Sequence, residues 1–124
     1  MSKSKLHKFI DEVKSKGETC LYTDKQASFG RIVVTALPSI DSEDFHSYKL
    51  EYPGDFSMKE LPYPYLFIAA VLGEEAFLQV VHRIGTAMRD FGEFKDVIGD
   101  YSLHIFVEGN VGVVLIEATS TNAT

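Results

Sequence analysis

Hydrophobic positions near the N-terminus recur with the spacing of a helix. Four apolar residues follow one another at i, i+3, i+4 and i+7, which places them on one face. They are Leu6, Phe9, Ile10 and Val13. Gly17 then stands where a C-terminal helix cap favours glycine. The pattern predicts a helix over residues 4–16 that packs this face on the core.

Three strands are predicted after this helix. The clearest is the third, because Tyr48, Leu50 and Tyr52 alternate with polar residues and so share one side of an extended chain. Pro53-Gly54 follows as a turn signal. The predicted strands cover residues 18–23, 31–37 and 47–52.

A second apolar block lies in the middle of the chain. Residues 65–71 are apolar at both parities, a pattern typical of a strand buried on both faces and shared by a buried helix. We interpret the block as a fourth strand. Gly73 separates it from a second amphipathic helix, predicted over residues 74–91, whose apolar stripe runs from Phe77 to Phe91.

The C-terminal part carries the strongest local signal, a β-hairpin. Residues 101–108 and 111–118 flank a Gly-Asn pair, a two-residue connection that suits a tight hairpin turn. With Glu108 opposite Val111, one face of the hairpin is wholly apolar. The other face mixes apolar and polar side chains: Ser102, His104, Phe106, Glu108, Val111, Val113, Leu115 and Glu117.

The predicted order of elements is α-β-β-β-β-α-β-β. Sequential hairpins with one strand–helix–strand crossover indicate an α+β fold, a two-layer sandwich of a mainly antiparallel sheet with helices packed on it. The crossover, which starts at residues 65–71, is expected to be right-handed. A chain of 124 residues suits a single domain, residues 1–124, and the polar residues 119–124 are expected to be a frayed tail.

Composition limits the partners. The chain has 12 Lys and Arg against 18 Asp and Glu. An acidic surface repels nucleic-acid phosphates and suits a basic protein partner, so we expect no nucleic-acid binding. Cys20 is the only cysteine, which excludes an intramolecular disulfide. Because no stretch resembles a signal peptide or could cross a bilayer, we expect a cytoplasmic protein without a membrane contact.

No motif in the sequence fixes a chemistry, and whether the protein is an enzyme is left open. None of the four histidines stands in metal-ligand spacing with another His, a Cys or a carboxylate, so we predict neither a metal nor a cofactor. His82 falls on the polar side of the second predicted helix, opposite the apolar stripe. It is either a general base, a residue that contacts a partner or, as we prefer, a solvated residue on a helix surface.

The mixed face of the hairpin is the candidate binding surface. If helices cover only the opposite face of the sheet, an apolar patch with a polar rim is left open, and such patches mark association surfaces. In the alternative, the first helix covers the patch. The candidate partner-binding residues are His104, Phe106, Val111, Val113, Leu115 and Glu117.

These features favour a non-enzymatic, cytoplasmic protein–protein interaction module (regulatory, chaperone-like or inhibitor-like) that forms a homodimer or other homo-oligomer through the hairpin face. The alternative is a small enzyme or small-molecule-binding domain with a pocket under the aromatic residues 52–67, using His104 or His82. The candidate pocket residues are Tyr52, Phe56, Tyr63, His82 and Arg89.

In size, acidity and order of helices and strands, the chain resembles the type III secretion chaperones. It departs from that family at the C-terminus, where the final helix of the family has no room. The likeness is one of fold order, which implies little about function by itself.

Overall fold

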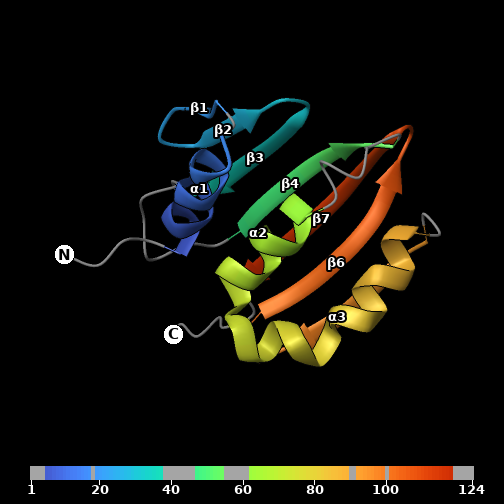
Figure 1. The fold of residues 1–124 in the computed structure, drawn as a ribbon. Helices are drawn as coiled ribbons and strands as arrows, with labels where there is room; N and C mark the ends of the chain where they lie inside the picture. The colour runs from blue at the N-terminus through green and yellow to red at the C-terminus, as the bar shows by residue number, and fades with distance from the viewer. Residues whose placement is uncertain are drawn as a thin grey trace.

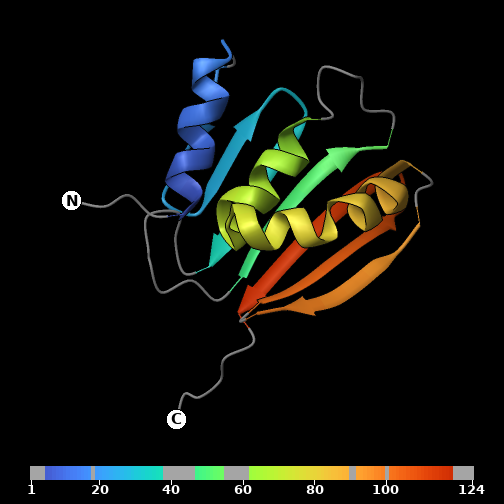
Figure 2. The same cartoon turned by 60° about the horizontal axis from the view of Figure 1, so that its bottom comes forward.

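The computed structural model describes residues 5–17, 19–37, 47–54, 62–89, 92–99 and 101–118. Within these residues, three helices pack on one face of a seven-stranded sheet, and every strand pair is antiparallel (Figures 1 and 2). The predicted α+β class, with two layers and an antiparallel sheet, is confirmed, and the predicted order of elements matches in outline.

The helices are α1 (Lys5–Ser15), α2 (Pro62–Leu72) and α3 (Glu74–Arg89). Between α2 and α3 the chain turns sharply at Gly73, whose φ of 95° lies in the region that favours glycine. The Gly73 amide donates to the carbonyl of Ala69, and its carbonyl accepts from the amide of Phe77. One residue thus ends α2 and starts α3, so that the two helices lie on the same face of the sheet (Figure 2).

The strands are β1 (Leu21–Tyr22), β2 (Gln26–Phe29), β3 (Ile32–Leu37), β4 (Ser47–Pro53), β5 (Phe94–Ile98), β6 (Tyr101–Glu108) and β7 (Val111–Ala118). Their order in the sheet is β1-β2-β3-β4-β7-β6-β5. The pairing of β4 with β7 therefore joins the N-terminal half of the sheet to the C-terminal half. The sheet ends at β1 and at β5.

The predicted hairpin is confirmed in its bounds and in its register. Strands β6 and β7 cover the predicted residues, and Glu108 pairs with Val111. Gly109 has a φ of 65°, as a tight two-residue turn requires. The predicted apolar face of the hairpin faces the helices, since Leu103 and Ile116 are fully buried.

The prediction of a strand over residues 65–71 is wrong, because the block lies in helix α2. Pro62 and Pro64 fall in the first helical turn, where a missing amide hydrogen leaves no helical bond unmade. The helix packs against α1, α3 and the sheet, and is therefore apolar on most of its circumference. Without a strand here, the predicted right-handed crossover does not exist.

Other differences concern short strands. Residues assigned to a connection form β2, and β5 was not predicted at all. The first predicted strand is reduced to the two residues of β1. Helix α3 is described as far as Arg89, and residues 90 and 91 of the predicted helix lie outside the described residues.

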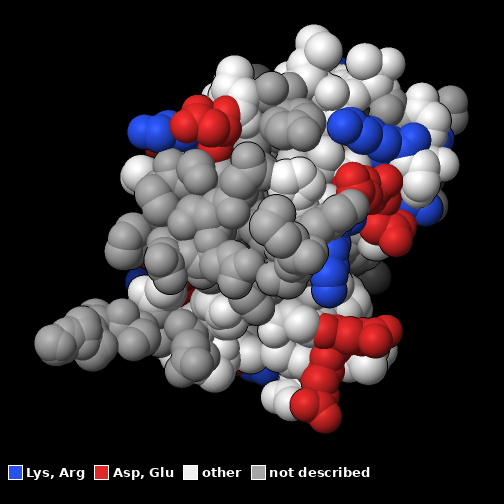
Figure 3. Space-filling view, turned by 90° about the vertical axis from the view of Figure 1, so that its left-hand side faces the viewer, with Lys and Arg blue, Asp and Glu red and all other residues white. Residues whose placement is uncertain are grey.

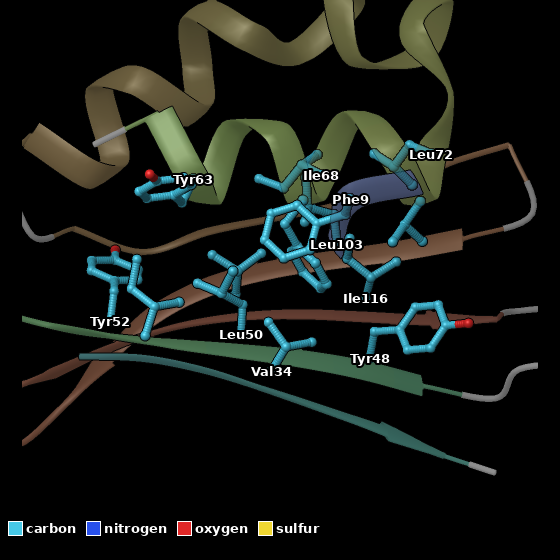
Figure 4. Close-up of a cluster of buried hydrophobic side chains, with 14 of the residues drawn as sticks. Phe9, Val34, Tyr48, Leu50, Tyr52, Tyr63, Ile68, Leu72, Leu103 and Ile116 are labelled. Atoms are coloured by element: carbon cyan, nitrogen blue, oxygen red, sulfur yellow. The ribbon is translucent and has the colours of Figure 1, made fainter. Parts of the chain in front are cut away.

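The core lies between the helices and the sheet (Figure 4). Ile68 and Leu72 of α2 pack over Leu50 and Ile116, which belong to the central strands. Phe9 of α1 joins them, with ring centroids 5.6 Å from Phe29 and 5.7 Å from Phe67. The apolar side of α1 is therefore used on the helix-covered face of the sheet.

Candidate functional site

The face of the sheet opposite the helices carries the predicted interaction residues. Side chains alternate between the two faces of a strand, and in β3, β4 and β6 the buried residues are the ones that point to the helices. We call the other side the open face. Because Phe9, Ile10 and Val13 belong to the core on the helix side, the alternative in which α1 covers the hairpin patch is wrong.

Strand register aligns the open-face residues in rows across the sheet. One row contains Val33, Glu51, Val113 and Phe106, from β3, β4, β7 and β6. The next row contains Thr35, Lys49, Leu115, His104 and Lys95, from β3, β4, β7, β6 and β5. An apolar centre is thus flanked by charged residues within the same rows.

Exposed hydrophobic side chains concentrate on the open face. Among the described residues, five large hydrophobic side chains are exposed, and strand register places four of them here. These four are Leu21, Leu37, Val97 and Val111. The fifth, Leu78, is on α3. Helices therefore cover one face of the sheet, and apolar side chains on the other face are exposed to water.

The six predicted partner-binding residues differ in accessibility. Val111 and Glu117 are exposed, whereas Phe106, Leu115 and His104 are half-buried. Val113 is only 2% exposed, because its neighbours on the open face cover it. Five of the six therefore remain accessible, and Val113 supports the patch from beneath.

His104 has a defined environment on this face. Its Nε2 lies 2.6 Å from Oε2 of Glu93, and its ring centroid lies 4.4 Å from that of Phe106. Lys95 is its directly paired residue on β5. The sequence puts Glu117 on the same hairpin face as this imidazole but does not put Glu93 there, because β5 is not among the predicted strands. A Gly-Asp pair at 99–100, before the hairpin, is the signal that marks β5.

A shallow groove of about 390 Å³ lies between α3 and β5. It is lined by His82, Arg83, Thr86, Ala87, Gly92, Glu93 and Phe94. Arg83 is already engaged, with Nη1 3.2 Å from Oδ2 of Asp96 and its guanidinium carbon 5.3 Å from the Phe94 ring centre. His82 is exposed here, as expected for the polar side of the helix.

The residues of the predicted aromatic pocket are not brought together. Tyr52 and Tyr63 are 1% and 6% exposed and belong to the core, and burial raises the pKa of Tyr52 to about 12. Phe56 lies outside the described residues, and the side chain of Arg89 is not described either. Of the three members of this set whose side chains are described, His82 lines the groove and the two tyrosines do not.

The described residues contain neither a cluster of metal ligands nor a membrane-spanning helix. No three or more His, Cys, Asp and Glu side chains among them group to hold a metal ion. In the same part of the chain, no helix is long and apolar enough to cross a membrane. Cys20 is half-buried, and burial raises the pKa of its thiol.

Charge is mixed rather than segregated. On the side of the molecule in Figure 3, basic and acidic side chains of the described residues lie next to one another. The open face also carries both signs: Lys49 and Lys95 on one hand, Glu51, Glu93, Glu108 and Glu117 on the other.

The chain matches no protein-family model, and no curated protein or solved structure is significantly similar to it. The resemblance to type III secretion chaperones therefore stays a prediction from the sequence.

Proposed function

We propose that this protein is a non-enzymatic interaction module that binds a second copy of itself through the open face. The observation that carries the proposal is the concentration of exposed hydrophobic side chains on that face, four of the five found among the described residues. Burying such side chains is the main favourable contribution to association.

The size of the face suits a stable dimer. Seven strands about 4.8 Å apart and mostly four to eight residues long give roughly 700 Å² of sheet plane. A stable complex buries about 800 Å² on each partner. Two sheets stacked face to face, as in a β-sandwich, therefore bury an area of the required order.

The charges favour a second copy over a uniformly basic partner. Lys49 and Lys95 share one row of the face. The two neighbouring rows contain the acidic residues Glu51 and Glu117. A two-fold axis brings the same surface onto itself, so a face with both signs can pair opposite charges. A basic partner would match the carboxylates and repel Lys49 and Lys95.

Sedimentation velocity from low to high micromolar concentration tests the proposal. Val97→Glu and Val111→Glu place a charge on exposed positions of the open face, where the fold tolerates it. Leu78→Glu on α3 adds the same charge to a hydrophobic position that is as exposed as Val97 and lies away from that face. We expect a wild-type dimer that both open-face variants weaken at least tenfold and the α3 variant leaves intact.

A wild-type monomer at high micromolar concentration contradicts the proposal. Equal weakening of the dimer by Leu78→Glu also contradicts it, because the loss would then result from the added net charge and not from a position on the open face. Leu115→Glu at the centre of the patch adds a third position, with circular dichroism to check its fold.

The groove between α3 and β5 supports a second candidate, a small-molecule-binding domain. Phe94 and Ala87 give it apolar walls, and Arg83 with His82 offers donors for an anionic group. Benzoate combines an aromatic ring with a carboxylate and is a suitable probe. Shifts of the Thr86 and Gly92 amide signals on titration with benzoate support this candidate, and unchanged spectra count against it.

A further inference from the structure

His104 lies on the open face between an aromatic ring and a carboxylate. Its ring stacks on Phe106 at 4.4 Å with an interplanar angle of 35°, and its Nε2 is 2.6 Å from Glu93 Oε2. The His104 side chain is 24% exposed, whereas that of Glu93 is 66% exposed. A second copy on this face thus covers an imidazole that is already oriented and a carboxylate that is still in water.

Other charged groups face the imidazole from neighbouring strands. Lys95 of β5 stands directly opposite. On β7 the opposite residue is the uncharged Leu115, and Glu117 occupies the diagonal position, roughly 7–8 Å away in a regular sheet. Lys49 of β4 lies one strand beyond Leu115. Of the carboxylates on the described open face, Glu93 is the one at hydrogen-bond distance.

The protonation state of His104 changes the electrostatic cost of association. With a neutral imidazole, carboxylates outnumber lysines on the face, so two copies bring like charges together. Docking also removes water from Glu93, which is unfavourable for a charge without a counter-charge. A protonated imidazole supplies that counter-charge at hydrogen-bond distance and lowers the negative charge that each copy presents.

We infer that self-association is coupled to protonation of His104, so that two copies bind more tightly at low pH. This inference rests on the proposed function, since it describes the regulation of the same surface. Histidine is the side chain that changes charge between pH 5 and 8. Because the dimer takes up protons as it forms, we expect the dissociation constant to fall about tenfold from pH 8 to pH 6.

Sedimentation equilibrium at both pH values, on the wild type and three variants, tests the coupling. His104→Gln removes the imidazole, and Glu93→Gln removes its carboxylate partner at an exposed position. His82→Gln is the matched control, because it removes an exposed imidazole on α3, away from the open face. It also controls for the general loss of negative charge on acidification.

We expect the wild type and His82→Gln to share the tenfold change, and His104→Gln to lose most of it. Glu93→Gln should dimerise at pH 8 at least as tightly as the wild type, a result that loss of a merely structural contact would not give. A dimer whose pH dependence survives His104→Gln overturns this inference and leaves the proposed function standing. Absence of a dimer at both pH values overturns the proposed function and the coupling together.

Discussion

The ring of Tyr52 lies over Gly112, its directly opposite residue in the β4–β7 pair. A Cβ on Gly112 would overlap atoms of the tyrosine ring. Glycine usually weakens the interior of a strand, and here its missing side chain is the space that a buried aromatic ring fills. Because β4–β7 joins the two halves of the sheet, this pair determines how closely they fit.

Gly112→Ala should therefore destabilise the protein strongly. The added methyl group must displace a fully buried ring, and overpacking of this kind costs about 1–3 kcal/mol or more. Urea denaturation measures the change. Gly92→Ala is the matched control, since a Cβ at Gly92 meets nothing within 4 Å, and equal losses in the two variants would contradict the account.

A second prediction tests whether residues 65–71 form helix α2 or the strand that their sequence pattern also permits. In a strand, Leu66 and Ile68 would point the same way. In α2, Ile68 is fully buried and Leu66 only half-buried. We expect Ile68→Ala to cost about 3 kcal/mol and Leu66→Ala less than half of that in urea denaturation. Similar losses at the two positions would argue against the helix.

The parts of the fold that the sequence predicts are those with a periodic pattern or a turn signal. Helices α1 and α3 have an apolar stripe, and the β6–β7 hairpin has a two-residue turn between alternating strands. Helix α2 has neither, because it contacts other elements on several sides and needs no polar face. Strand β2, QASF in sequence, is four residues long and has one large hydrophobic side chain. An alternation of hydrophobic and polar residues cannot be recognised in so short a segment.

In the candidate site, too, the sequence predicts the contacts that a local pattern determines and not those that depend on distant strands. The hairpin register alone placed Phe106, Leu115 and Val111 together, since a two-residue turn fixes which side chains share a face. The contact between His104 and Glu93 depends on β5, at the other edge of the hairpin. No local pattern around His104 contains that information. The burial of Val113 likewise depends on neighbouring strands rather than on its own segment.

Asp96 gives a third prediction, about the edge of the sheet at β5. The Val97 amide donates to Asp96 Oδ1 at 2.8 Å, and Arg83 Nη1 donates to Oδ2 at 3.2 Å. The carboxylate thus occupies a donor that another strand would need. Asp96→Ala should free this edge, so that sedimentation velocity shows species larger than the dimer.

Asp24→Ala is the control for this experiment. It removes a carboxylate from an exposed turn outside the strands and should leave the size distribution unchanged. If Asp96→Ala also stays at the wild-type size, edge pairing is prevented by something other than this carboxylate.

Two buried tyrosines predict how stability changes in alkali. Burial, with a smaller contribution from Tyr101, raises the pKa of Tyr48 from 10.0 to about 12, and burial with Tyr65 does the same for Tyr52. In the unfolded chain both phenols ionise near pH 10, whereas in the fold they stay neutral to about pH 12. The unfolded state therefore gains from ionisation first. The contribution of these two tyrosines to stability should be constant below pH 10, fall between pH 10 and 12, and then level off.

Urea denaturation at pH 8 and pH 11 measures this loss, which should be about 1 kcal/mol for each tyrosine at pH 11. Tyr52→Phe removes one of the two buried phenols, and it should reduce the difference between the two pH values by about half. Any contribution that does not involve Tyr52 is common to the wild type and the variant. An unchanged pH difference in Tyr52→Phe would contradict the assignment of the alkaline loss to the buried phenols.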